Sequence, residues 1–145
     1  MDPRSEKNIA GLNSKVQPLA RELIETATEQ GIHVKVICGN RTYEEQDDLY
    51  AQGRSKGGSI VTKARGGQSM HNFGTAFDIG IFSKDGKEYL GESPDYAKVG
   101  KIGEALGLEW GGSWKFVDEP HFQLTDGRTL AQLRSAFEEH GDALV

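Results

Sequence analysis

The sequence contains a single cysteine, Cys38, among its 145 residues, which excludes an internal disulfide bond. Long hydrophobic runs are also absent: no stretch approaches the length that spans a bilayer, and the first residues lack the apolar segment of a signal peptide. Acidic residues outnumber basic ones: the chain has 22 Asp and Glu but only 17 Lys and Arg, which gives a net charge of −5. Binding to nucleic acid or anionic membranes draws mainly on clustered Lys and Arg. We therefore expect a chain that folds without oxidation and binds neither nucleic acid nor, in a stable manner, a membrane.

The length and composition are those of one soluble globular domain. A chain of 145 residues buries one core but is too short for two, and 36% hydrophobic with 27% charged residues is typical of a folded protein. We expect a single catalytic domain over residues 1–145, present as a monomer.

The first half of the sequence shows a helix, a strand and a second helix. Hydrophobic residues at helical spacing between positions 16 and 27 predict a helix that ends at Gly31, and the β-branched run 32–38 predicts a strand. Thr42 and Glu45 have the spacing of a capping box, which places the next helix start at Thr42. Arg41 is therefore expected at a strand-to-helix corner, where scaffolds usually display functional side chains.

The second half of the sequence predicts a loop, two strands and two helices. Residues 53–68 are rich in Gly, Ser, Lys and Arg and predict a mobile surface loop. From Thr75 onward, alternation predicts a strand whose odd-numbered residues 77, 79 and 81 face the core while Asp78 points away from it. The remaining expected elements are a hairpin turn at 85–86, a helix at 96–106, a last strand within 115–124 and a closing helix at 130–137. The pattern predicts an α+β fold: a small, mainly antiparallel sheet with a metal on one face and helices on the other.

The stretch "SMHNFGTAFD", residues 69–78, places a histidine and an aspartate seven residues apart. A catalytic zinc site uses three protein ligands so that the fourth position can hold water. His71, Asp78 and His121 meet that count, with Gly74 allowing the chain to turn between the first two and His121 supplied by the last strand. The spacing therefore indicates a zinc site.

These residues also carry a family resemblance. "SMHNFGTAFD" followed by "DEPHF" resembles the pattern S-x-H-x-x-G-x-A-x-D and D/E-x-x-H of the zinc D-alanyl-D-alanine carboxypeptidases of the VanX and VanY type. The whole chain, including "GNRTYEEQDDLYAQGR" and "WGGSWKFVDEPHF", is most similar to their phage relatives, the L-alanyl-D-glutamate endopeptidase endolysins. The resemblance implies Zn²⁺ as the cofactor, with His71, Asp78 and His121 as its ligands.

The resemblance also implies three further roles. Asp118, three positions before the last histidine, would be the general base. Arg41 would bind the substrate, polarise the scissile carbonyl and stabilise the developing oxyanion, and Ser69 would hydrogen-bond within the site. Strand alternation alone would put Glu119 on the face of His121, so Glu119 stays open as the alternative base.

Several of these residues have simpler interpretations as well. Arg41 could form a structural ion pair with one of the acids that follow it, and Asn40 replaces the aromatic residue that relatives often carry before this arginine. Gln46, Trp110 and Trp114 are candidates for lining the cleft, although tryptophans are as often part of a core.

The implied function is zinc-dependent hydrolysis of the peptidoglycan stem peptide at the L-Ala–D-Glu bond. The enzyme would be a phage endolysin made in the host cytoplasm without a signal peptide, reaching the cell wall after holin-type release. One alternative is a D,D-carboxypeptidase that removes terminal D-Ala. Another is a non-catalytic, zinc-bearing peptide-binding module, which is disfavoured because such a module would need neither Asp118 nor Arg41.

Overall fold

The computed structural model describes all residues, 1–145, as an α+β fold, as the sequence predicted. The helices are α1 (Pro3–Ala10), α2 (Gln17–Glu29), α3 (Tyr43–Ala51), α4 (Asp95–Ala105) and α5 (Leu130–His140). The strands are β1 (His33–Cys38), β2 (Ala76–Phe82), β3 (Glu109–Trp110) and β4 (His121–Gln123), and two short 3-10 helices are η1 (Met70–Phe73) and η2 (Gly111–Ser113). No helix has the length and apolar character needed to cross a membrane.

The four strands form one antiparallel sheet in the order β1-β2-β4-β3. The register pairs Asp78 of β2 with His121 of β4 on one side and with Cys38 of β1 on the other. Three chemically reactive side chains thus stand in one row across three neighbouring strands, although they lie far apart in the sequence.

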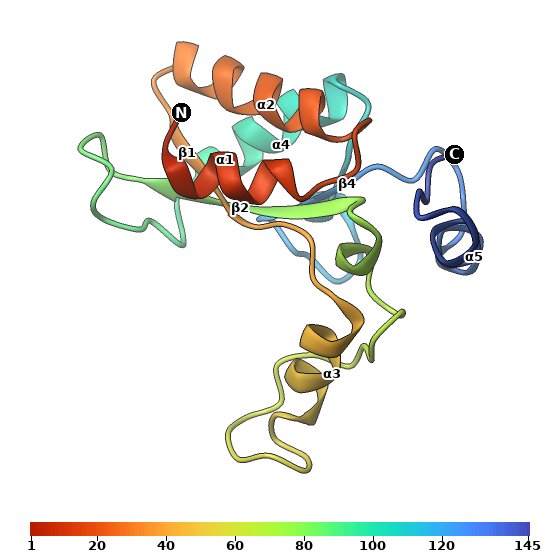
Figure 1. Cartoon of the computed structure of the whole chain (residues 1–145). Helices are drawn as coiled ribbons and strands as arrows, with labels where there is room; N and C mark the ends of the chain where they lie inside the picture. The colour runs from red at the N-terminus through yellow and green to blue at the C-terminus, as the bar shows by residue number, and fades with distance from the viewer.

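The core lies between the sheet and the helices that cover it. In Figure 1, α2 and α4 lie above the sheet, whereas α3 and the loop that follows it extend below. Phe77, Ile79 and Ile81 are almost fully buried and Asp78 only partly, as expected for β2, but Ala76 and Gly80 on the other face are buried too. Phe77 stacks on Phe122 of the neighbouring strand, with ring centroids 5.6 Å apart.

Three local features differ from the expectations. Helix α1 was not expected; Asp2 caps it, and its Ser5 and Asn8 side chains hydrogen-bond to the backbone N–H and C=O of Val36 on β1. Strand β3 lies in a segment expected to be loop, and β4 starts only at His121 because the preceding residues form a turn. Short elements of this kind leave little periodic signal in a sequence.

The α3 segment agrees with its prediction in detail. Thr42 and Glu45 form the reciprocal capping box, so the helix begins at Tyr43. Residues 52–69 contain no helix or strand, as expected for a surface loop, but several hydrogen bonds attach the loop to α3. Asp47 accepts a hydrogen bond from Gly66 N, and Gln46 donates one to the carbonyl of Ala64.

Candidate active site

His71 is fixed by the short helix η1 and by its two ends. The Ser69 hydroxyl caps the helix by accepting a hydrogen bond from the His71 backbone N–H at 3.3 Å. Gly74 ends it in the left-handed conformation, with φ of 70°, and a Cβ there would lie 2.8 Å from the backbone N of Asn13. Only glycine meets both conditions, so the break between the histidine and the Asp78 strand is required by the backbone.

Asp78 lies between the two histidines and contacts each with a different oxygen. His71 Nε2 is 3.4 Å from Asp78 Oδ2, and His121 Nδ1 is 3.2 Å from Asp78 Oδ1. The histidine side chains are only 6% and 10% exposed and that of Asp78 is 24% exposed. The structure therefore brings the three expected metal ligands together in one half-buried cluster.

In each histidine, the ring nitrogen that faces away from Asp78 has a hydrogen-bond partner, and this bond determines which nitrogen is free to bind a metal. His71 Nδ1 is 2.9 Å from the carbonyl oxygen of Gly39, which can only accept, so Nδ1 carries the proton. His121 Nε2 is 2.8 Å from Gln123 Oε1 and donates in the same way. In the neutral rings, the lone pairs then lie on the nitrogens that face Asp78. A lone pair facing a carboxylate is repulsive unless a proton or a metal ion lies between, so this donor set fits a divalent cation.

Cys38 offers a different donor set that the sequence interpretation did not include. Cys38, His71 and Asp78 also have potential ligand atoms within 4.8 Å of one another. The Cys38 Sγ, however, lies 3.9 Å from His71 Nδ1, the nitrogen already bonded to Gly39. The free lone pair of His71 points to Asp78 instead, which favours the set with His121.

The pKa values of His71 and Asp78 show that the two side chains attract each other. Burial lowers the pKa of His71, but its contacts with Asp78 and Cys38 outweigh burial and raise the pKa to about 9. Burial raises the pKa of Asp78, yet the two histidines outweigh it and hold that pKa well below its usual range. The carboxylate therefore stays ionised and draws positive charge, either a proton or a metal ion, to the histidines.

Of the two acids considered as general base, Asp118 lies nearer to the cluster. Its Oδ2 is 4.0 Å from His121 Nδ1 and its side chain is 53% exposed, whereas Glu119 makes no such contact. Alternation did not apply, because Asp118 precedes the turn at Glu119 and Pro120 and lies outside β4. Burial raises the pKa of Asp118; attraction to His121 opposes this rise, and the charge of Asp78 adds to it.

Arg41 lies at the expected corner and has no acidic partner. Its backbone N–H donates to the carbonyl of His71 at 2.9 Å, which joins the corner to η1. Its guanidinium donates to Gln46 Oε1 at 2.9 Å and to Cys38 Sγ at 3.4 Å. No carboxylate forms an ion pair with it. The simpler interpretation, an ion pair with one of the following acids, is therefore not seen in the structure, although hydrogen bonds with Thr42 and, to a lesser extent, the charge of Arg41 lower the pKa of Glu45.

The two tryptophans have different positions. Trp110 is 9% exposed and donates its indole N–H to the carbonyl of Glu119, so it belongs to the core. Trp114 is half-buried and lies against His121, with ring centroids 5.1 Å apart. Trp114 thus forms one wall beside the cluster.

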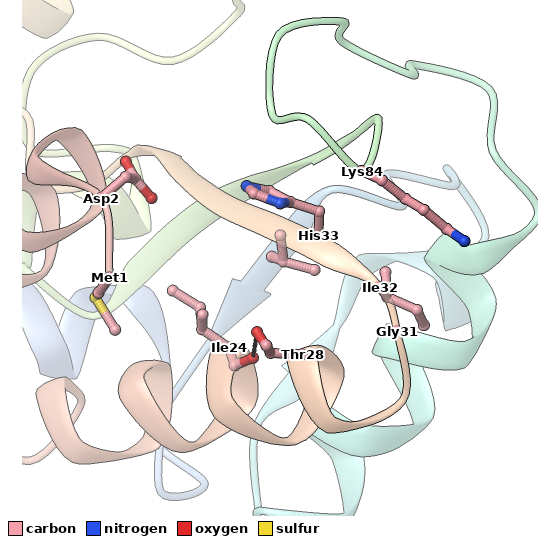
Figure 2. Close-up of a pocket in the computed structure, with 9 residues that line it drawn as sticks. Met1, Asp2, Ile24, Thr28, Gly31, Ile32, His33 and Lys84 are labelled. Atoms are coloured by element: carbon pink, nitrogen blue, oxygen red, sulfur yellow. Dashed lines mark hydrogen bonds between the residues drawn. The ribbon is translucent and has the colours of Figure 1, made fainter.

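Of two cavities of similar size, one includes a candidate site residue and the other does not. A cavity of about 490 Å³ runs along α3 and is lined by Arg41 together with Glu45, Asp48 and Lys56. The other, of about 480 Å³, lies between the N-terminus, α2 and β1 and is lined by residues such as Met1, Ile24, Thr28 and His33 (Figure 2). It contains none of the candidate site residues.

Comparisons with known proteins agree with this site. Residues 62–124 match the family described as D-alanyl-D-alanine carboxypeptidase. The chain is 44% identical over 122 residues to the peptidoglycan L-alanyl-D-glutamate endopeptidase CwlK of Bacillus subtilis, covering 78% of this chain and 73% of CwlK. It is 30% identical over 126 residues to the L-alanyl-D-glutamate peptidase of a Listeria phage, covering 83% of this chain but 41% of that longer protein.

Solved structures share the fold. The L-Ala D-Glu endopeptidase ChiX of Serratia marcescens superposes with a TM-score of 0.66 at 26% identity, covering 86% of this chain and 89% of ChiX. The vancomycin resistance D,D-pentapeptidase VanY, solved with Zn(II), superposes with a TM-score of 0.60 at 19% identity, covering 90% of this chain and 80% of that chain.

The fold and these relatives define a metallopeptidase. Since the match to the Bacillus endopeptidase extends over more than two thirds of both proteins, the chain belongs to the D-alanyl-D-alanine carboxypeptidase family of peptidases.

Proposed function

We propose that the chain is a zinc-dependent endopeptidase that cleaves the L-Ala–D-Glu bond of the peptidoglycan stem peptide. The observation that carries the proposal is the placement of Asp78 between two histidines whose metal-binding nitrogens face it, with Asp118 and Arg41 at the edges of the same cluster. The names of the Bacillus, Listeria phage and Serratia relatives support this bond specificity.

In this proposal His71 Nε2, the Asp78 carboxylate and His121 Nδ1 hold the metal. When bound, zinc polarises the scissile carbonyl and lowers the pKa of a water molecule. Asp118 accepts a proton at its carboxylate from the attacking water and delivers it to the leaving amine. A raised pKa suits this role, because a general base works best when its pKa approaches the operating pH.

Arg41 supplies fixed positive charge for the carbonyl oxygen as it becomes negative. No carboxylate forms an ion pair with the guanidinium, whose hydrogen bonds go to Gln46 and Cys38, so its charge can act on the substrate. The Ser69 hydroxyl accepts a hydrogen bond from the backbone N–H of His71 and so helps to position that residue. We propose that the hydroxyl also hydrogen-bonds to the substrate.

A second candidate is a D,D-carboxypeptidase, which the description of the matching family favours. The two activities give different products. Purified peptidoglycan should be incubated with the zinc-loaded enzyme and the fragments analysed by mass spectrometry. We expect stem peptides that begin with D-Glu. Release of free D-Ala with the L-Ala–D-Glu bond intact would support the carboxypeptidase instead, and the Asp118→Ala variant is the matched control.

We also propose that the enzyme acts on the cell wall as a monomer, reaching it as phage endolysins do, by holin-type release. The likeness to the Listeria phage peptidase supports this route. Co-expression with a holin should cause rapid lysis of a bacterial host, and expression alone should not. Sedimentation of the purified enzyme should give a mass of 15.9 kDa.

A further inference from the structure

Gln46 is a fully buried amide, 0% exposed, and both ends of it are hydrogen-bonded. Its Oε1 accepts a hydrogen bond from Arg41 Nη1 at 2.9 Å, and its Nε2 donates one to the carbonyl of Ala64 at 3.0 Å. The Ala64 carbonyl fixes the orientation of the amide, because it can only accept. The oxygen of Gln46 is therefore directed to Arg41.

Neither hydrogen-bond partner of the Arg41 guanidinium is a carboxylate. Gln46 holds Nη1, and Cys38 Sγ accepts from Nη2 at 3.4 Å. A carboxylate at position 46 would hold the guanidinium equally well, but it would share the positive charge and would face the Ala64 carbonyl with a second acceptor. An amide fixes the guanidinium without reducing its charge.

The backbone of Arg41 is fixed separately from its side chain. Its N–H donates to the carbonyl of His71 at 2.9 Å, and its carbonyl accepts from Asn72 Nδ2 at 3.1 Å. Loss of the Gln46 amide would therefore release the guanidinium while the strand-to-helix corner stays in place.

We propose that Gln46 is a positioning residue for the hydrolysis reaction. It directs the Arg41 guanidinium into the site, holds it without adding a negative charge, and joins it to the 52–69 loop through Ala64. The inference rests on the proposed function, because it assumes that Arg41 stabilises charge on the scissile carbonyl.

Kinetics of two variants test this role. Gln46→Met removes both hydrogen bonds at similar size, and Gln46→Glu keeps an acceptor for Arg41 but adds a negative charge. Both should lower kcat, by up to about 100-fold, with KM nearly unchanged, since a displaced or neutralised oxyanion contact belongs to the transition state. Gln30→Glu, on the exposed C-terminal end of α2, is the matched control and should retain the wild-type rate.

A double-mutant cycle separates positioning from a structural role. In an Arg41→Ala background, Gln46→Met should cause no further loss of kcat/KM, because its effect passes through Arg41. Independent, additive losses would overturn the proposal. If Gln46→Met does not fold, the same cycle with Gln46→Glu decides, and additive losses there have the same meaning.

Nitrogen-15 NMR of the arginine guanidinium groups gives a reading that does not require activity. The wild-type Arg41 guanidinium should show slow rotation with resolved Nη–H signals, and Gln46→Met should average them. A wild-type enzyme that cleaves no peptidoglycan would reject the proposed function, yet the NMR comparison would still test the link between Gln46 and Arg41. Unchanged signals in Gln46→Met would reject that link.

Discussion

Replacing Gln123 by Leu should weaken zinc binding without removing any metal ligand. Gln123 Oε1 lies 2.8 Å from His121 Nε2, and the two residues are only 7% and 8% exposed, so water cannot easily take the place of the lost acceptor. The proton of His121 is then free to move to Nδ1, the nitrogen that should bind the metal. Loss of such a hydrogen bond typically weakens metal affinity by about 10- to 100-fold. This range corresponds to about 1.4 to 2.7 kcal/mol of binding free energy.

The measurement is a zinc competition titration against a chromophoric chelator at fixed pH. Gln123→Glu is the matched variant, because it retains an acceptor for His121 and should bind zinc at least as tightly as the wild type. Metal-free Gln123→Leu should also lose about 1 to 3 kcal/mol of unfolding free energy, since a buried N–H is left without a partner. Wild-type zinc affinity in the Leu variant, or an equal loss in both variants, would refute the reasoning.

Further predictions concern the catalytic groups and the metal. Asp118→Ala should keep zinc but lose about 100- to 10,000-fold in turnover, and steady-state kinetics of Glu119→Ala should stay near wild type; the reverse result would exchange the two assignments. Arg41→Ala should lower kcat and kcat/KM about equally, by roughly 100- to 1,000-fold, with partial recovery in Arg41→Lys; an earlier melt with normal turnover would remove Arg41 from the catalytic residues. Chelation should lower the melting temperature, because a ligand at 100 times its Kd stabilises the native state by about 2.7 kcal/mol, and His71→Ala should melt alike with and without zinc.

Strong local patterns made most of the fold predictable from the sequence. The capping box of Thr42 and Glu45, and the alternation through Phe77 and Ile79, each depend on neighbouring residues, and both are present in the structure. Helix α1 carries a local start signal in Asp2 and Pro3, but it is only eight residues long and buries only Ser5 and Ile9, so its sequence shows little apolar periodicity. Its position depends on contacts with β1, which no local window contains.

The candidate site divides in the same way. His71, Asp78 and His121 were identifiable because their spacing matches a zinc motif, and the structure brings them together. Cys38 and Gln123 were not, because the place of Cys38 follows from strand pairing and the contact of Gln123 with His121 depends on side-chain orientations within β4. Cys38 faces Asp78 only through the β1-β2 register, which contains a bulge between Val36 and Cys38, and Gln123 reaches His121 from the same strand.

Gln46 shows a further limit of sequence patterns. Helix α3 carries almost no apolar stripe, and Gln46 is its one buried residue, in a run of charged neighbours. The sequence singled out Gln46 as a candidate for lining the cleft, but its complete burial and its partners depend on the position of the 52–69 loop. Those partners are the Arg41 guanidinium and the Ala64 carbonyl.

The contacts of α1 with β1 have a consequence for solubility. Ser5 and Asn8 occupy the outward-facing N–H and C=O of Val36, which a neighbouring strand would otherwise bond. An uncovered strand edge is a template for pairing with another chain, and the opposite edge of this sheet, β3, is only two residues long. Deletion of residues 1–8 would therefore leave the N–H and C=O of Val36 on the outer edge of β1 free to bond to another chain. We expect the shortened chain to self-associate through β1 even if its metal site forms normally, so helix α1 protects the enzyme against aggregation.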